Sequence, residues 1–127
     1  MAKRTEAELA CELKLSRRSV QSGVPEIEAT FSVRSATEVP VRVTFNSGQS
    51  YDFRLRDSEG KELWRWSSGR IFAMVVIEKE LGPDGWTFRE KIPLGAQGSN
   101  LTPGRYQVVA ELAASPAVRC EAGLDVR

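Results

Sequence analysis

The sequence predicts an all-β fold, a β-sandwich of about eight or nine short antiparallel strands that forms one domain over residues 1–127. Three observations predict it. Apolar and polar residues alternate through most of the chain, turn residues separate the alternating runs, and no segment shows the apolar stripe of an amphipathic helix. Because each strand would have one apolar face, a second sheet is needed to cover it.

The first half of the chain is expected to contain strands over residues 9–15, 27–34, 39–45 and 51–56, each with its apolar side chains on one face. The apolar faces consist of Leu9, Cys11, Leu13 and Leu15 in the first run; Ile27, Ala29, Phe31 and Val33 in the second; Val39, Val41, Val43 and Phe45 in the third; and Tyr51, Phe53 and Leu55 in the fourth. The alternate polar residues, Asp52 among them, are expected to face water.

Residues 57–60, with the sequence DSEG, are predicted to form a tight turn that closes a hairpin. The Asp side chain can accept hydrogen bonds from the backbone that follows it, and Gly takes a positive φ without steric cost. The strand after this turn ends near Trp66, and the alternation then breaks. Further strands are expected at about residues 74–81, 86–94, 104–113 and 117–126.

The segment LTPGRY, residues 101–106, indicates which kind of sandwich to expect. A Tyr at the start of a late strand, after a Pro-Gly turn, is typical of the tyrosine corner of immunoglobulin-like sandwiches, where its hydroxyl bonds to upstream backbone. Antibody domains have a cysteine two residues after this Tyr, and this chain has Val108. An immunoglobulin-like sandwich is therefore expected, with apolar packing in place of that disulfide.

Cys11 and Cys120 lie on the apolar faces of the expected first and last strands. These strands often run beside one another in this fold, so a disulfide between them is geometrically possible. We favour two buried free thiols instead, because small apolar side chains are common in the cores of intracellular proteins. Two thiols without a histidine do not predict a metal site.

The composition argues against catalysis and against highly charged partners. The chain has no histidine, which is the commonest general base, and it has no GxGxxG, GxxxxGK[ST], CxxC or EF-hand spacing. We therefore expect no enzyme, no cofactor and no metal, and we interpret Asp52, Asp57 and Glu59 as turn and surface carboxylates. The net charge of +1, from 18 basic and 17 acidic residues, indicates no nucleic-acid partner.

The N-terminus, MAKRTEAELACELKLS, lacks the apolar run of about seven or more residues that a secretory signal needs. No later segment approaches the roughly twenty apolar residues that span a bilayer. The expected location is therefore the cytoplasm, with no membrane partner. The sequence leaves open the oligomeric state and the earlier removal of a leader.

Four short motifs together resemble a known family. The motifs are FNSGQSYDF (residues 45–53), the turn DSEG (residues 57–60), ELWRWS (residues 62–67) and LTPGRY (residues 101–106). Their order and spacing resemble those of the BsuPI family of bacterial intracellular proteinase inhibitors, over most of residues 25–113. The stretch KIPL at residues 91–94 and the extension over residues 116–127 depart from the family pattern. The resemblance implies an immunoglobulin-like sandwich that inhibits an intracellular subtilisin-like serine protease.

Inhibition of a protease requires a loop that protrudes in a substrate-like shape and is ordered before it binds. The break after Trp66 is the best candidate, since the rings of Trp66 and Phe72 could pin its ends. The predicted protein-binding loop consists of Ser67, Ser68, Gly69, Arg70, Ile71 and Phe72. Ile71 or Phe72 would suit the apolar pocket of a subtilisin-like protease, whereas Arg70 would suit a trypsin-like one.

Other interpretations of these segments stay open. The loop could be an ordinary crossover between the sheets, and the loops at residues 82–86 and 95–100 are rival contacts. Trp64 and Trp66 would share one face of a strand, with at least one of them in the core; two exposed rings would instead form a binding platform. The alternative function is an interaction or assembly module that adds an edge strand to a partner's sheet without inhibiting proteolysis.

Overall fold

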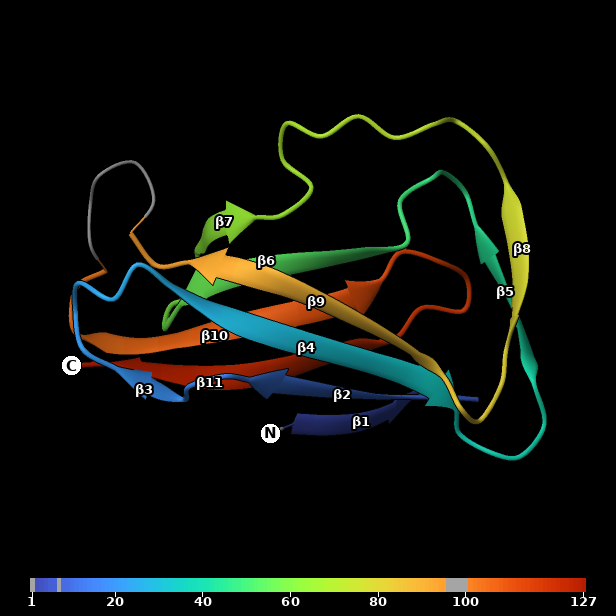
Figure 1. Cartoon of the computed structure of the whole chain (residues 1–127), viewed down its shortest axis with the longest axis horizontal. Coiled ribbons are helices and arrows are strands. Elements are labelled where there is room, and N and C mark those ends of the chain that lie inside the picture. The colour runs from blue at the N-terminus through green and yellow to red at the C-terminus, as the bar shows by residue number, and fades with distance from the viewer. Residues whose placement is uncertain (1, 7, 96–100) are drawn as a thin grey trace.

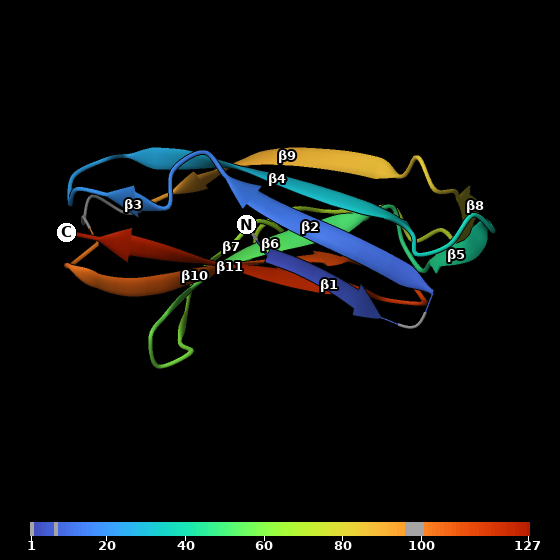
Figure 2. The same ribbon diagram turned by 90° about the horizontal axis from the view of Figure 1, so that it is seen from below.

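The computed structural model describes residues 2–6, 8–95 and 101–127, and these residues form strands and turns without a helix. Two sheets lie face to face (Figures 1 and 2). One sheet contains, in spatial order, β1 (Ala2–Glu6), β2 (Leu9–Leu15), β4 (Glu26–Ser35) and β9 (Trp86–Pro93). The other contains β3 (Ser19–Val20), β11 (Arg119–Val126), β10 (Gly104–Leu112), β6 (Tyr51–Asp57) and β7 (Glu62–Arg65). The predicted all-β sandwich is confirmed.

A small third sheet lies at one end of the sandwich (Figure 1, right), where β5 (Val41–Phe45) pairs with β8 (Ile77–Leu81). The described strand pairings are antiparallel, except that β3 runs parallel to β11. The described residues hold more strands than predicted, because β1 and the two-residue β3 were not predicted.

Two predicted strands are shorter than the sequence indicated. Val39 precedes β5 and is 68% exposed, and residues 74–76 form an exposed connection before β8. β8 begins at Ile77 because Ile77 pairs with Phe45, the last residue of β5, so the residues before it meet no further part of β5. Apolar residues alone predicted a strand there, but a strand also needs a neighbour with which to form hydrogen bonds.

The core lies between the two sheets and is built by the apolar faces that the alternation predicted. Phe31 of β4 and Phe53 of β6 are fully buried and meet edge to face, with ring centroids 6.2 Å apart. Such a pair contributes about 0.5–1.5 kcal/mol beyond the apolar area that it buries. Tyr106 of β10 is also buried, and its hydroxyl donates to the Thr102 carbonyl over 2.6 Å, as predicted for a tyrosine corner.

The β6–β7 hairpin closes through the predicted turn. Asp57 Oδ1 accepts hydrogen bonds from the amides of Glu59 and Lys61, each over 2.9 Å, and Gly60 has a φ of 86°. Both features were expected from the residue types in this turn. The hairpin matters for the candidate site because it places β7, and the chain that leaves β7, beside β6.

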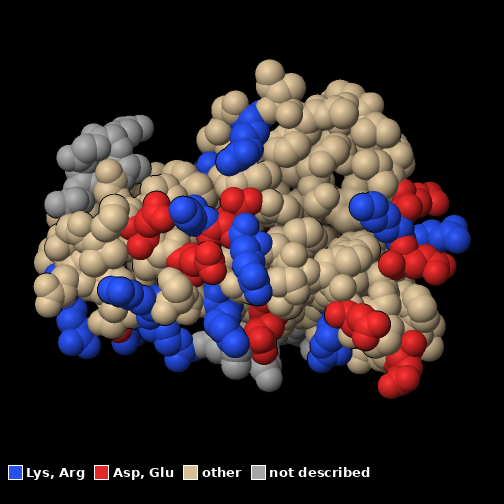
Figure 3. All heavy atoms as spheres, in the orientation of Figure 1, with Lys and Arg blue, Asp and Glu red and all other residues tan. Residues whose placement is uncertain are grey.

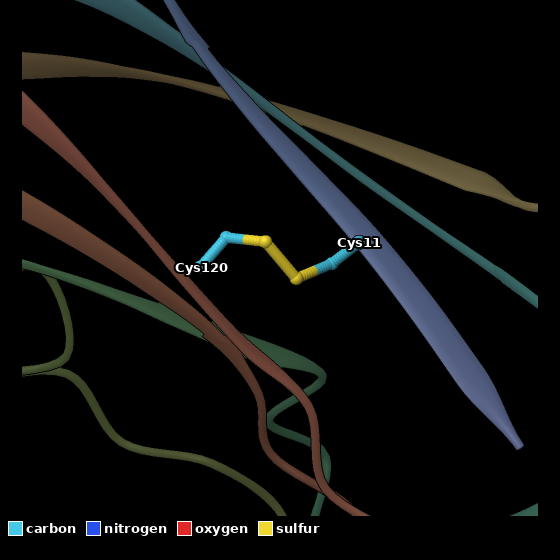
Figure 4. Close-up of a disulfide and its surroundings, with 2 residues drawn as sticks. All are labelled: Cys11 and Cys120. Carbon is cyan, nitrogen blue, oxygen red and sulfur yellow. A yellow bond between two sulfur atoms is a disulfide. The ribbon is translucent and has the colours of Figure 1, made fainter. Parts of the chain in front are cut away.

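Cys11 of β2 and Cys120 of β11 form a disulfide between the two sheets (Figure 4), with Cα atoms 6.2 Å apart. The expectation of two free thiols is therefore wrong. It relied on the expected compartment, whereas the strand positions decide the outcome. The two strands belong to facing sheets, so both side chains point into the core and meet there. The bond joins residues that are 109 positions apart in the sequence.

Candidate functional site

We call residues 66–76, which join β7 to β8, the connecting loop. It arches away from the strands (Figure 1, top), and this part of the surface is mostly uncharged, whereas acidic and basic side chains are interspersed on the sheet below it (Figure 3). Two apolar side chains of the loop, Ile71 and Met74, are 98% and 94% exposed. Exposed apolar side chains gathered in one place are typical of surfaces that contact another molecule.

The Asp52 carboxylate fixes the start of the connecting loop. Asp52 lies on β6, is only 4% exposed, and accepts hydrogen bonds from the Ser67 amide over 3.1 Å and the Ser67 hydroxyl over 2.6 Å. It also accepts from the Phe53 amide over 2.9 Å and from the Arg65 guanidinium over 3.2 Å. A buried carboxylate with this many donors is fully satisfied, so the loop is firmly tied to β6.

Trp66 is the centre of an aromatic cluster at the base of the loop. Its ring stacks on Tyr51 of β6, with centroids 4.7 Å apart, and meets Phe72 of the loop, with centroids 5.9 Å apart. The Arg70 guanidinium lies 4.1 Å from the centroid of the Trp66 ring, and Arg70 Nε donates to the Trp66 carbonyl over 2.9 Å. The contact between Trp66 and Phe72 closes residues 67–72 into a short arch, and Arg70 is folded back onto it.

Tyr51 connects this cluster to the other sheet. Its hydroxyl donates to the Glu90 carboxylate of β9, and its ring stacks on Phe88 with centroids 4.5 Å apart. The pKa of Tyr51 is raised to about 12, chiefly by burial. The hydrogen bond to Glu90 and the negative charge of that carboxylate add to the effect. The hydroxyl therefore stays protonated at neutral pH and links β6 of one sheet to β9, the edge strand of the other.

Arg65, the last residue of β7, keeps its positive charge beside Asp52. Arg65 donates to the Glu62 carboxylate over 2.7 Å and to Asp52 over 3.2 Å. The hydrogen bond to Glu62 is the main reason why the pKa of Arg65 is raised above its ordinary value, and Asp52 adds to the effect. The charge of the buried Asp52 is thus balanced by a permanent cation at the same end of the loop.

The second half of the connecting loop is tied down at one carbonyl. Ala73 accepts hydrogen bonds from the Gly48 amide over 2.8 Å and from the Val75 amide over 3.1 Å. The second of these bonds closes a γ-turn with Met74 at its centre. Gly48 permits the close approach, because a Cβ added at this position would lie 3.3 Å from the Ala73 nitrogen.

The structure places the predicted loop residues as follows. Ser68, Gly69, Arg70 and Ile71 are exposed, while Ser67 and Phe72 are half-buried at the two ends of the arch. Neither Trp64 nor Trp66 is fully buried, and both pack against the core from its edge, so the core position expected for one of them is not found. Trp66 lies beyond the end of β7, and the loop therefore begins one residue earlier than the break at Ser67 indicated.

Asp52 was also predicted wrongly, since it was expected to face water and is only 4% exposed. The reason is that β7 and the start of the connecting loop fold across β6 and cover the carboxylate. One signal could have identified it. Asp52 belongs to the YDF motif, and its partners Arg65 and Ser67 belong to the WRWS motif, so the two most specific motifs of the family resemblance contact each other in the structure.

The two rival loops, residues 82–86 and 95–100, give less support for a contact site. At residues 82–86, Gly85 packs so closely on the β4 backbone that an added Cβ would lie 2.2 Å from the Val33 carbonyl oxygen, and the Gly82 carbonyl accepts from the Ser35 amide. That turn is part of the packed body. Of the other rival, residues 95–100, all but Gly95 lie outside the described residues.

The described residues show no group of three or more acidic, cysteine or histidine side chains placed to hold a metal ion. Within the same residues, no helix has the length and the apolar character needed to cross a membrane. The arrangement that remains is a raised loop with a fixed base and apolar side chains at its surface.

A family model described as BsuPI, intracellular proteinase inhibitor, matches residues 12–117. The chain belongs to the BsuPI family. Because the family is described as proteinase inhibitors, its description implies a protein partner, a proteinase, and a non-catalytic role for the BsuPI fold. All four motifs of the resemblance lie inside the matched residues, and the whole of β11, with Cys120, lies beyond them.

Solved structures resemble this BsuPI chain in fold. The C-terminal domain of wzt is similar with a TM-score of 0.55 and 14% sequence identity, over 98% of this chain and 77% of that one. The soluble domain of PmoD from a Methylocystis species is similar with a TM-score of 0.44 and 10% identity, over 99% of this chain and 97% of that one. No curated protein sequence matches the chain. At these identities the first similarity supports the sandwich fold alone.

Proposed function

We propose that this BsuPI chain is a non-catalytic inhibitor of a subtilisin-like serine protease inside the cell, and that residues 67–72 contact the protease. One observation carries the proposal: Ile71 is 98% exposed on a loop whose base is fixed by the buried Asp52 and by Trp66. The family description supports a proteinase as the partner. The absence of histidine from the sequence supports a protein without the usual hydrolytic machinery.

The fixed base matters because binding has to overcome the loss of conformational freedom. Each side chain that becomes immobile on binding costs about 0.5–1.5 kcal/mol, and a flexible loop adds the cost of ordering its backbone. In this chain, the hydrogen bonds to Asp52 and the contact between the tilted rings of Phe72 and Trp66 order the loop before any partner arrives. A larger part of the contact energy then appears as affinity.

The side chains of the loop favour an apolar pocket in the partner. Arg70 would have to give up its hydrogen bond and its ring contact with Trp66 in order to enter an acidic pocket of the trypsin type. Phe72 is likewise held by Trp66. Within the described residues no such contact holds Ile71, so its side chain is available to an apolar surface of the partner.

The proposal is tested by measuring the inhibition constant, Ki, of the purified chain against a subtilisin-like protease and against trypsin. We expect inhibition of the first enzyme only. Ile71→Asp should raise Ki at least about tenfold, because a carboxylate would replace an apolar contact worth about 1.5–3 kcal/mol. Val39→Asp is the control: it places the same charge at another exposed, β-branched apolar residue, 68% exposed in the β4–β5 connection, and should leave Ki unchanged. A wild-type chain that inhibits no subtilisin-like protease would refute the proposal.

The alternative function, edge-strand addition, would use an edge strand such as β7 or β9, each of which has one strand neighbour in its sheet within the described residues. β9 carries the exposed side chains Arg89 and Lys91. Charged side chains on an edge strand oppose the addition of a further strand, so this edge gives the alternative little support. A tight complex with a protein that is not a protease, without inhibition, would favour the alternative.

A further inference from the structure

We infer that Met74 is the residue that enters the main apolar pocket of the protease, and that Ile71 contacts the surface beside that pocket. The inference rests on the proposed function and deepens it, since the contact then extends beyond residues 67–72 to the second half of the connecting loop. Met74 is 94% exposed, and it is the one long, unbranched apolar side chain of the loop that no described contact holds.

The backbone at Met74 is presented in a fixed position. Met74 is at the centre of the γ-turn that the Val75 amide closes on the Ala73 carbonyl, and the Gly48 amide binds the same carbonyl over 2.8 Å. The turn therefore holds Met74 at its apex, and residue 48 connects it to the body of the protein. Ile71 lies between Arg70, which donates to the Ser67 and Trp66 carbonyls, and Phe72, which contacts Trp66, and no described hydrogen bond closes a turn around Ile71 itself.

The side-chain chemistry favours Met74 over its neighbours. A pocket-filling residue has to be free, apolar and able to adapt its shape. Met is unbranched, has three rotatable bonds and adapts to irregular apolar spaces. Ile71 is branched at Cβ and therefore stiff at χ1, so it suits a surface better than a narrow pocket. Phe72 is held on the Trp66 ring and is not free.

This assignment has a chemical consequence, because an exposed thioether is open to oxidation. Hydrogen peroxide transfers one oxygen atom to the Met74 sulfur; the sulfur is oxidised to the sulfoxide by two electrons, and the peroxide is reduced to water. The product is polar, and an apolar pocket offers no partner to its oxygen. Oxidation of Met74 should therefore switch inhibition off, and reduction of the sulfoxide should restore it.

The test compares Ki before and after peroxide treatment of the wild type and of Met74→Leu, with the oxidised residue identified by mass spectrometry. The wild type should lose affinity on the order of tenfold to a hundredfold on oxidation and recover it with methionine sulfoxide reductase. Met74→Leu keeps an unbranched-Cβ apolar side chain, so its Ki should stay near the wild-type value and should not respond to peroxide. Because Met74→Leu still contains Met1, the response of this variant to peroxide also controls for oxidation of Met1.

A second comparison separates the two apolar residues. Met74→Asp should raise Ki more than Ile71→Asp does, with both variants retaining the wild-type melting temperature because both positions are exposed. If Ile71→Asp has the larger effect, or if Met74 sulfoxide forms without a change in Ki, the inference is overturned while the proposed function stands. If the untreated wild type does not inhibit, the proposed function fails and the inference fails with it.

Discussion

Among single residues, Asp52 makes the contacts on which the connecting loop depends, and its substitution gives the first prediction. Asp52→Asn keeps the size of the side chain but replaces one acceptor oxygen with a donor, which faces the donors of Ser67 and Arg65. Leaving buried donors unsatisfied costs about 1–3 kcal/mol. We expect the free energy of unfolding, measured in urea, to fall by about that amount, and the loop to be cleaved faster by an unrelated protease.

Ser67→Ala is the matched control for Asp52→Asn. It removes the hydroxyl that donates to Asp52 and leaves the Ser67 amide bond and the other donors in place. The expected loss is about 1 kcal/mol, with little change in the rate of loop cleavage. Equal effects of the two substitutions would mean that the carboxylate does not hold the loop as described.

The misplacement of Asp52 in the sequence analysis has a physical cause at the same scale. A period-two pattern assigns a residue to one face of its strand, and Asp52 is indeed on the face opposite to the core ring of Phe53. The pattern contains no information about a later segment of the chain that folds back over that face. Here the covering residues are Arg65 and Ser67, which are distant in sequence and cover the carboxylate by hydrogen bonding to it.

Tyr51 gives a prediction about alkaline pH. Its pKa is raised from 10.0, the value of the unfolded chain, to about 12 in the folded protein, chiefly by burial and then by Glu90. Between these pH values the unfolded chain loses the phenolic proton while the folded chain retains it. The stability that Tyr51 contributes is therefore fully present below about pH 10 and is lost as the pH rises through about 12.

The measurement for Tyr51 is urea unfolding of the wild type and of Tyr51→Phe from pH 9 to pH 12. Phe cannot ionise, so the stability advantage of the wild type over the variant should shrink across this range. An advantage that stays constant would show that the Tyr51 hydroxyl does not sit between the sheets in the environment described above.

At the scale of elements, the connecting loop depends on a close approach between two segments. Gly48→Val would place a branched side chain against Ala73, where even a Cβ would lie 3.3 Å from the backbone nitrogen. The second half of the loop should move outward and lose its hydrogen bond from residue 48. We expect Ki to rise about tenfold while the free energy of unfolding changes by less than about 1 kcal/mol, since the core strands are untouched.

Gly123→Val serves as the control for Gly48→Val. Gly123 lies on β11, and a Cβ added there would have no heavy atom within 4 Å. This substitution should leave Ki unchanged. A similar rise in Ki for both variants would contradict the assigned role of the Gly48–Ala73 contact.

The elements also show where the sequence predicts well. Alternation predicted β2, β4, β6, β10 and β11, because each has one face on the core. It failed at residues 74–76, since Met74, Val75 and Val76 are apolar and were assigned to a strand that begins only at Ile77. The same error hid Met74 as a candidate contact: exposed apolar side chains on a loop cannot be distinguished by pattern from those of a buried strand.

For the whole molecule, the disulfide gives a prediction about stability. Replacing both cysteines, Cys11→Ala with Cys120→Ala, removes a link between residues 109 positions apart. Loss of such a link typically costs about 2–5 kcal/mol. We expect the free energy of unfolding in urea to fall by this amount and Ki to stay unchanged, because the connecting loop is anchored elsewhere. Labelling of free thiols in the wild type before and after unfolding, with and without reductant, checks that the bond is present.

The sequence predicted two layers because the longer strands have one apolar face, but it could not assign strands to layers. β2 and β11 were expected side by side, and they belong to opposite sheets. The pattern of a strand specifies which face is buried and leaves its neighbours unspecified. For the same reason the disulfide was possible but not predicted, since the distance between Cys11 and Cys120 depends on how the sheets stack.

The position of that disulfide also determines what a successful attack on the chain would yield. Any break in the backbone between residues 66 and 76 leaves Cys11 in the N-terminal piece and Cys120 in the C-terminal piece, and the bond between them keeps the pieces joined. Cleavage of this loop would therefore yield one disulfide-linked molecule, whose two pieces separate only when the chain is both unfolded and reduced.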